Sequence, residues 1–306
     1  MSALSVDPLW PRAGDWAAPD EKTVPDAVLL GVPAWRTSLS PTGAGETPAA
    51  VRDALRRFSP TVLGPPPLDL TAALTIADAG DVDDPDGRDG EARVRAAVAA
   101  LSAARLVIAL GGDNSATYGV AQGRGVGGLI TLDAHFDLRD GESNGSPVRR
   151  LIADGLDPRR IVQIGIADFA NSAAYAQRAL DAGITVITLD EVRRRGIDEV
   201  VAAALRIAGG AGASPGDAVA PASGIHVDVD VDVCDRSVAP GCPASVPGGL
   251  AAWELRTLVR GLARHQGVTS ADIVEVDATA DTPDARTVRL AALCVLELLA
   301  GMAERR

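Results

Sequence analysis

The sequence predicts an α/β protein, in which a mostly parallel central sheet lies between two layers of helices. Short apolar runs rich in β-branched residues alternate with alanine-rich runs of helical period along the 306 residues. The strand candidates are apolar almost throughout, as expected of strands that are buried on both faces. Because parallel strands are joined by crossover helices, this alternation indicates a three-layer α/β/α arrangement.

The expected strands are the short apolar runs at 27–30, 106–110, 129–132, 161–166, 185–188, 225–229 and 273–276. The expected helices are the longer alanine-rich runs at 47–57, 91–104, 148–154, 172–182, 251–265 and 285–303. Pro48 suits the first turn of a helix, where a missing N–H costs nothing. Gly111 and Gly112 end the strand at 106–110, since glycine favours a turn.

Composition indicates one domain over residues 1–306, with an irregular N-terminal segment at 1–25 and a surface loop at 209–223. The net charge of −12 argues against a nucleic-acid partner. No apolar run reaches the roughly 18–20 residues of a membrane span. The first residues lack the basic and apolar stretches of a signal peptide. Cys234, Cys242 and Cys294 are too few for a disulfide framework, so we expect a cytoplasmic protein.

Two acidic motifs predict a metal centre. Asp133, His135 and Asp137 are spaced two residues apart. Three aspartates, at positions 228, 230 and 232, repeat this spacing. On extended backbone, alternate side chains point to the same side. So many carboxylates on one side repel one another, and a divalent cation relieves that repulsion.

Acidic residues follow four of the predicted strands. Asp113 follows the strand at 106–110, Asp133 the strand at 129–132, Asp230 the strand at 225–229, and Glu275 lies at the end of the strand at 273–276. Ligands of open α/β sheets bind beyond the carboxyl ends of the strands. Carboxylates with one imidazole suit Mn²⁺, Mg²⁺, Fe²⁺ or Co²⁺, and two such ions would nearly balance four carboxylates.

A structural role is the alternative for each acidic residue taken singly. An aspartate after a strand usually caps a helix or forms a turn. Asp113 fits that role, because Asn114 and Ser115 stand at a helix start. An alternating Asp-Val strand with one wet face is a second alternative, but it does not explain His135 at an equivalent strand end.

The motifs resemble those of the ureohydrolase family, the arginase and agmatinase group. They are Gly111-Gly112-Asp113-Asn114-Ser115, Asp133-Ala134-His135-Phe136-Asp137, Asp230-Val231-Asp232 and Glu275-Val276-Asp277, in that order. The resemblance covers the chain from about Gly31 to its end. It implies a three-layer α/β/α fold, two Mn²⁺ ions per chain, a homo-oligomer, and hydrolysis of a C–N bond in a guanidino or formimidoyl group.

The same resemblance implies roles for single residues. One ion would be held by Asn114, Asp133, Asp137 and Asp230, and the other by Asp133, His135, Asp230 and Asp232. Hydroxide between the ions would attack the substrate, and Asp137 would pass a proton to the leaving amine. Glu275 would hydrogen-bond the amidine nitrogens.

Asn114 departs from the family pattern, because histidine is usual at this position. An amide oxygen is a weaker ligand than imidazole, so we expect a weakened first metal site. In the alternative, Asn114 only caps a helix, and the centre holds one ion or is inactive.

Within the family the chain most resembles the formimidoylglutamases, and the resemblance lies in residues 132–139 and 143–149. A guanidinium suits a carboxylate, so Arg139, with Asn144 or Arg149, is expected to bind an acidic small-molecule substrate. An ion pair of Arg139 with the metal carboxylates, and a helix-surface place for Arg149, are the alternatives.

We therefore expect a binuclear manganese hydrolase that cleaves N-formimidoyl-L-glutamate to L-glutamate and formamide, in histidine degradation. The alternatives are a ureohydrolase acting on a guanidino acid or agmatine, and a catalytically silent protein of this fold.

Overall fold

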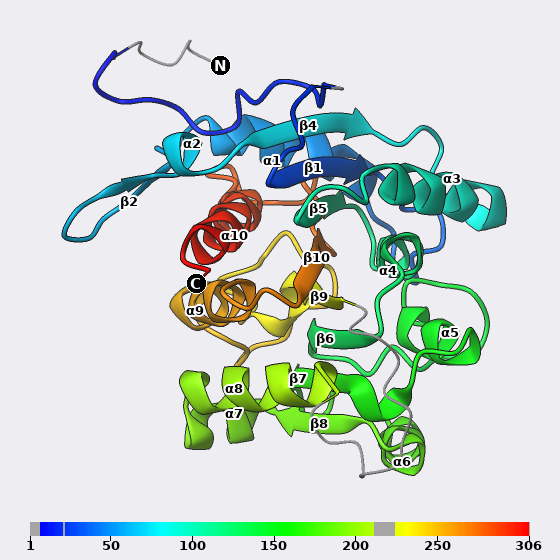
Figure 1. Cartoon of the computed structure of the whole chain (residues 1–306). Helices are drawn as coiled ribbons and strands as arrows, with labels where there is room; N and C mark the ends of the chain where they lie inside the picture. Colours follow the sequence, from blue (N-terminus) through cyan, green and yellow to red (C-terminus); the bar gives the residue numbers. More distant parts are fainter. Residues whose placement is uncertain (1–6, 21, 211–223, 306) are drawn as a thin grey trace.

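The computed structural model describes residues 7–20, 22–210 and 224–305. Eight parallel strands in this part of the chain form one sheet, in the order β4-β1-β5-β10-β9-β6-β7-β8 (Figure 1). Their bounds are β1 Ala27–Val32, β4 Ile76–Asp81, β5 Leu106–Gly111, β6 Gly128–Leu132, β7 Ile161–Ile166, β8 Thr185–Thr188, β9 Ile225–Asp230 and β10 Val268–Val274. The predicted fold class is confirmed.

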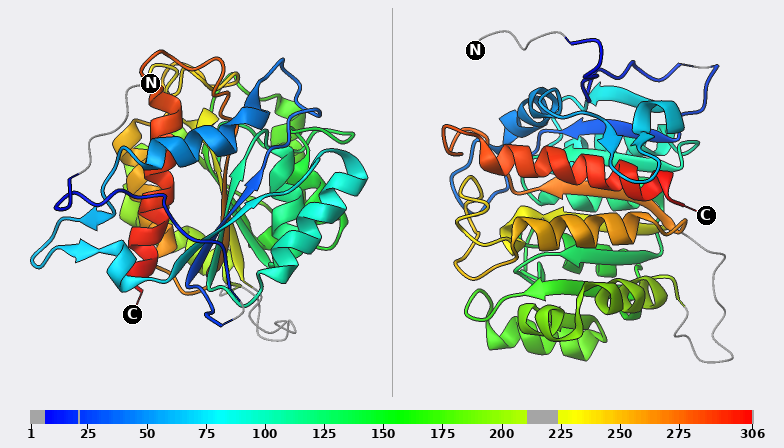
Figure 2. Two further views of the ribbon diagram at one scale, coloured as in Figure 1. Left: turned by 90° about the horizontal axis from the view of Figure 1, so that it is seen from above. Right: turned by 90° about the vertical axis from the view of Figure 1, so that its left-hand side faces the viewer.

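Helices cover both faces of the sheet, and Figure 2 shows the three layers edge-on. One layer contains α1 (Thr47–Leu55), α7 (Leu189–Arg195), α8 (Ile197–Ala208), α9 (Ala252–Ala263) and α10 (Arg286–Ala303). The other contains α3 (Gly87–Ala100), α4 (Ser115–Arg124), α5 (Pro147–Ala153) and α6 (Ala173–Ala182). Both faces of the sheet are therefore buried, which is why its strands are apolar almost throughout.

The remaining elements are short. A two-stranded antiparallel pair joins β2 (Thr61–Val62) to β3 (Leu68–Asp69), and the single turn α2 (Leu70–Ala73) follows. Three 3₁₀ turns lie at Ala44–Glu46, Pro158–Arg160 and Val231–Val233. The last of these carries one of the predicted metal ligands, as described below.

Most predicted elements are present, with shifted ends. The strands at 161–166 and 185–188 have the expected bounds. Helix α3 begins at Gly87 and β10 begins at Val268, both earlier than expected. We did not predict β2, β3, β4, α2, α7 or α8, and of α4 we predicted only the start, at Asn114 and Ser115. Strand β4 lies at the sheet edge and is only partly buried, so it lacks the apolar run by which the inner strands were recognised.

The predicted N-terminal segment contains no helix or strand over residues 7–20 and 22–25. Most of the predicted loop at 209–223 lies outside the described residues. Among the helices of the described residues, none combines the length and the apolar character needed to cross a membrane.

The central strands carry the candidate site. Strands β5, β10, β9 and β6 are neighbours in the sheet, although the chain visits them in the order β5, β6, β9, β10. The late strands β9 and β10 are inserted between the earlier two. Because all four are parallel, their carboxyl ends meet at one edge of the sheet, where a ligand site is expected.

Candidate metal centre

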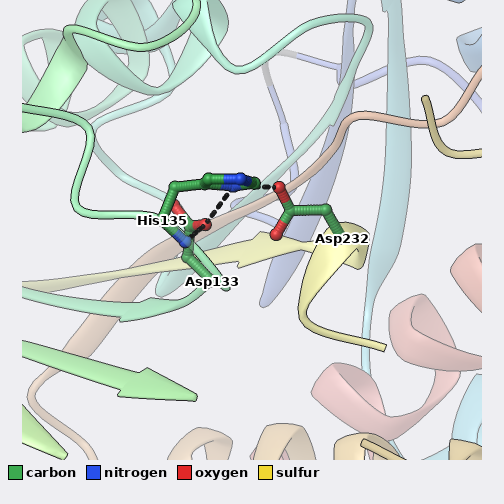
Figure 3. A group of neighbouring side chains, drawn as sticks. All are labelled: Asp133, His135 and Asp232. Atoms are coloured by element: carbon green, nitrogen blue, oxygen red, sulfur yellow. Dashed lines mark hydrogen bonds and ion pairs between the residues drawn. The ribbon is translucent and has the colours of Figure 1, made fainter. Parts of the chain in front are cut away.

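Asp133, His135 and Asp232 form the middle of the site (Figure 3). The possible ligand atoms of these three side chains lie within 4.8 Å of one another. His135 Nδ1 lies 2.6 Å from Asp232 Oδ2 and 3.6 Å from Asp133 Oδ1. The second oxygen of Asp133, Oδ2, is buried and has no hydrogen-bond partner. An unpaired buried carboxylate oxygen in such a group suits a divalent cation.

The backbone fixes these carboxylates from two adjacent strands. Asp133 directly follows β6, and Asp230 is the last residue of β9. The 3₁₀ turn after β9 brings Asp232 back toward β6, where its Oδ1 accepts a hydrogen bond from the Ala134 N–H at 2.9 Å. Asp230 Oδ1 accepts one from the Asp232 N–H at 2.8 Å. The predicted convergence of these residues is therefore present.

Burial and mutual repulsion disturb the titration of this group. Burial, together with Asp232, raises the pKa of Asp133 to about 7. Burial and neighbouring carboxylates raise the pKa values of Asp137 and Asp230 well above their usual range. Burial alone would lower the pKa of His135, but Asp232 and Asp133 outweigh it and raise that pKa to about 11. The carboxylates therefore compete for positive charge, and the protonated imidazole supplies some of it.

Asn114 points into the same group. It lies just before α4, where its side chain makes no capping hydrogen bond. Its Nδ2 donates to Asp137 Oδ2 at 2.6 Å and to Asp230 Oδ2 at 3.3 Å. Its Oδ1 accepts a hydrogen bond from the Thr117 hydroxyl at 2.6 Å. The side chain is thus not a helix cap, and it links Asp137 to the rest of the centre.

Glu275 follows β10 and flanks the centre. Its Oε1 accepts two hydrogen bonds of 2.8 Å, from the Asn114 N–H and from Asn144 Nδ2. Burial and Asp113 raise its pKa to about 7, against the effect of these donors. With Oε1 held twice by the protein, Oε2 makes no hydrogen bond to any described residue and is left for a ligand.

A cavity of about 220 Å³ opens above these side chains. Its lining includes His135, Asp137, Asp230, Asp232 and Glu275 from the centre, and Arg139 and Asn144 from the loop after β6. Arg139 is exposed, and its guanidinium has no hydrogen bond or ion pair with any described residue. The alternative of an ion pair between Arg139 and the metal carboxylates is therefore not what the structure contains.

Asn144 and Arg149 have protein partners. Asn144 Nδ2 contacts Glu275, and its Oδ1 accepts a hydrogen bond from the Leu39 N–H at 3.0 Å. Arg149 does not line the cavity. Its Nε donates to the Arg139 carbonyl at 2.7 Å, and its Nη2 donates to the Gly141 carbonyl. Arg149 thus supports the loop that carries Arg139, and its direct contact with the substrate stays a prediction.

Asp228 belongs to a different group from Asp230 and Asp232. It lies two residues before Asp230 on β9, in register with Asp272 of β10, and both Asp228 and Asp272 are fully buried. Burial and Asp272 raise its pKa well above the usual range. Asp272 also contacts His226 Nε2 at 3.1 Å. The repeated Asp-Val spacing therefore supplies two residues to the centre, and the third lies inside the sheet.

Sequence reasoning missed some residues of the site. Thr117, one helical turn beyond Asn114, contacts its amide oxygen. Leu39 and Ser40 line the cavity, although they are remote in sequence from every motif. The spacing of three between 114 and 117 is a signal for Thr117, because such residues share a helix face. Nothing in the sequence indicates that 39 and 40 reach the cavity.

The comparisons with known proteins agree with these observations. A model of the arginase family matches residues 25–301. A formimidoylglutamase of Bacillus subtilis is 33% identical over 299 residues, which cover 92% of this chain and 89% of that protein. A guanidinopropionase of Pseudomonas aeruginosa is also 33% identical, over 291 residues that cover 90% of this chain and 86% of that protein.

Solved structures have the same fold. The crystal structure of formimidoylglutamase from Bacillus subtilis matches with a TM-score of 0.88 and 32% identity, over 99% of this chain and 95% of that one. A Trypanosoma cruzi formiminoglutamase with Mn²⁺ has a TM-score of 0.84 at 24% identity, over 97% of this chain and 99% of that one. The family match, the relatives and the carboxylate-rich centre at the strand ends lead to one conclusion: this chain belongs to the arginase family.

Proposed function

We propose that this protein is a manganese-dependent hydrolase that cleaves N-formimidoyl-L-glutamate to L-glutamate and formamide, a step of histidine degradation. The observation that carries the proposal is a carboxylate-rich centre beneath a cavity lined in part by Arg139, whose guanidinium has no ion pair with any described residue. Formimidoylglutamases of Bacillus subtilis and Halalkalibacterium halodurans, 33% and 36% identical to this chain, support the same activity.

The residues of the centre fit two divalent ions per chain. Asn114, Asp133, Asp137 and Asp230 would hold one, and Asp133, His135, Asp230 and Asp232 the other. The Mn²⁺ named for the trypanosomal structure supports manganese. When bound, such ions lower the pKa of water enough for it to act as a nucleophile at neutral pH. Asn114 ligates only if its amide oxygen replaces Nδ2 on the side of the carboxylates, since an amide nitrogen has no free lone pair.

The reaction adds water to the formimidoyl carbon and breaks the bond from that carbon to the glutamate nitrogen. Glu275 is placed to accept a hydrogen bond from the amidine through Oε2, because Oε1 is held by Asn114 and Asn144. Asp137 takes the proton that the water loses and gives it to the departing nitrogen. Burial and Asp133 raise its pKa well above the usual range, the direction that favours a carboxyl carrying a proton.

Arg139 is the residue we assign to a substrate carboxylate. Arg139 lines the cavity and its guanidinium makes no ion pair with any described residue, so it is available for a bidentate contact. Asn144 lines the same cavity, where its existing contact with Glu275 suits a role in holding that carboxylate for the substrate.

Hydrolysis of a guanidino acid is the second candidate. The guanidinopropionase of Pseudomonas aeruginosa is as similar in sequence as the Bacillus subtilis formimidoylglutamase. A guanidino acid carries one carboxylate, which Arg139 could equally bind. Agmatine has no carboxylate and gains nothing from Arg139, so we place it last.

We also propose that the protein is cytoplasmic and that it acts as a homo-oligomer. The three free cysteines, Cys234, Cys242 and Cys294, suit a reducing compartment. Assembly follows from the family resemblance alone.

The decisive experiment measures product release by the purified protein, with Mn²⁺ and after chelation. The substrates are N-formimidoyl-L-glutamate, guanidinobutyrate, guanidinopropionate, arginine and agmatine. We expect metal-dependent formamide release from the first and little turnover of the others. Urea release from a guanidino acid as the main activity would replace the first proposal with the second. No turnover of any of them, with two ions bound, would contradict both.

A further inference from the structure

Thr117 lies within α4, three residues after Asn114, and is fully buried. Its hydroxyl donates to Asn114 Oδ1 at 2.6 Å, and its backbone N–H donates to the Asn114 carbonyl at 3.3 Å. No motif of the sequence includes it. Among the predicted metal ligands, Asn114 is the one with a side-chain amide. The amide oxygen can bind a metal ion, whereas the amide nitrogen cannot.

The hydrogen bond to its backbone N–H fixes the position of Asn114 independently of its amide. The backbone N–H is held by Glu275 Oε1 at 2.8 Å. The amide plane lies between Thr117 on one side and Asp137 with Asp230 on the other. A half turn about the last side-chain torsion exchanges oxygen and nitrogen between these two sides without moving the backbone.

A hydroxyl suits both orientations, because it can donate to the amide oxygen or accept from the amide nitrogen. When the nitrogen faces the carboxylates, the Thr117 hydroxyl donates, as in this structure. When the oxygen faces the carboxylates, the same hydroxyl accepts from Nδ2. An apolar residue at 117 would leave a buried amide atom unpaired in either orientation, and that is unfavourable.

We propose that Thr117 is a positioning residue, whose hydroxyl keeps the amide of Asn114 hydrogen-bonded in either orientation and so allows the amide oxygen to turn toward the first metal ion as a ligand. The inference rests on the proposed function insofar as the centre binds metal. It implies that Asn114 and Thr117 work as a pair in this chain. A histidine at position 114 would instead coordinate through a ring nitrogen, and no amide would have to be oriented.

The test compares Thr117→Val, which has nearly the same shape without the hydroxyl, with Thr117→Ser, which keeps the hydroxyl. Mn²⁺ binding is measured on the full chain by titration, following free Mn²⁺ by electron paramagnetic resonance. We expect the weaker of two ions to bind about 10–100-fold less tightly to Thr117→Val, as for other groups that orient a ligand. Thr117→Ser is expected to stay within about threefold of the unaltered protein.

A double-variant cycle separates orientation from packing. In an Asn114→His background, we expect Thr117→Val to change Mn²⁺ affinity by less than about threefold. Equal losses in both backgrounds would show that the hydroxyl acts only through packing, and would overturn the inference. Unchanged affinity in Thr117→Val alone would overturn it too.

Two controls keep the result readable. The thermal unfolding midpoint of each metal-free variant reports packing, and if Thr117→Val does not fold, Thr117→Ala replaces it. Turnover of the unaltered protein is measured separately. If the unaltered protein binds two ions but hydrolyses none of the substrates, the proposed function is contradicted. The Mn²⁺ affinities of Thr117→Val and Thr117→Ser still decide the inference in that case.

Discussion

Two residues of the site have backbone conformations that are unusual for their type. Asp137 and Glu275 have φ of 51° and 62°, in the left-handed region. This region is unfavourable for residues with a Cβ, especially for a glutamate, and such conformations gather at functional sites. Glu275 turns the chain directly after β10, and Asp137 turns it within the loop that follows β6, and both residues line the cavity.

Asn114→His is expected to raise Mn²⁺ affinity without abolishing turnover. Imidazole is a stronger donor than an amide oxygen, and it brings no amide nitrogen that must first turn away from the carboxylates. The measurement is a Mn²⁺ titration with steady-state kinetics beside the unaltered protein. Unchanged binding would show that position 114 is not a ligand.

Asp232→Ala is expected to remove the second ion and to lower kcat by at least about 100-fold. The change deletes a carboxylate that contacts His135 and fixes the Ala134 backbone. Metal content by mass spectrometry and kcat are the measurements. Asp198→Ala, at an exposed position in the first turn of α8, is the control and should retain both ions. Full activity in Asp232→Ala would refute a binuclear centre.

Arg139→Ala is expected to lower kcat/KM for N-formimidoyl-L-glutamate by about 10–100-fold, since a charge-assisted pair contributes about 1.5–3 kcal/mol. Any slow turnover of agmatine should be unaffected. Arg88→Ala, which removes a largely exposed guanidinium on α3, serves as the matched control. Equal losses for both compounds would mean that Arg139 supports the structure rather than a substrate carboxylate.

At the scale of elements, a buried ion pair joins the helices beside the site. Arg150 of α5 donates to both carboxylate oxygens of Glu91 on α3, at 2.6 and 2.7 Å, and both residues are buried. The guanidinium also lies over the Tyr118 ring of α4, at 3.7 Å from its centroid. Three consecutive helices of one layer thus meet at Arg150.

Glu91→Ala is expected to lower the free energy of unfolding by about 3–5 kcal/mol, because it leaves a buried guanidinium unpaired. Urea unfolding followed by circular dichroism measures the effect. Glu142→Ala removes the partner of Arg88 in an exposed ion pair, and it should cost less than about 1 kcal/mol. Similar losses in the two variants would show that burial does not strengthen the Glu91 pair.

At the scale of the whole molecule, the centre couples metal binding to pH. Burial and neighbouring charges raise the pKa of Asp133 to about 7, and Asp232 and Asp133 raise that of His135 to about 11. The carboxyls must lose protons and the imidazole must become neutral before the residues bind a cation. Protons therefore compete with the metal, and acidification favours the metal-free state.

We accordingly expect Mn²⁺ affinity to rise by about tenfold or more per pH unit between pH 6 and 8. The rise should continue above pH 7, because His135 still holds its proton there in the metal-free protein. Titrations in buffers of matched ionic strength measure the slope. An affinity independent of pH would contradict the raised pKa values.

The whole-molecule fold was largely predictable, because its signals are local. Strands such as Ile161–Ile166 are buried on both faces and therefore read as continuous apolar runs. Edge strand β4 and the ends of α3 and β10 were not predictable in this way. Their residues are partly exposed or continue the pattern of a neighbouring element, so tertiary contacts set their limits.

The sequence by itself determined the chemistry of the site, since it placed Asp133, His135, Asp230 and Glu275 at strand ends. Only the tertiary structure decided which residues meet. The insertion of β9 and β10 between β5 and β6 makes the four ends adjacent. The loop after β6 also turns Arg149 to the Arg139 carbonyl. The strand ends meet through tertiary packing, and residue spacing along the chain carries no information about which distant strands become neighbours in the sheet.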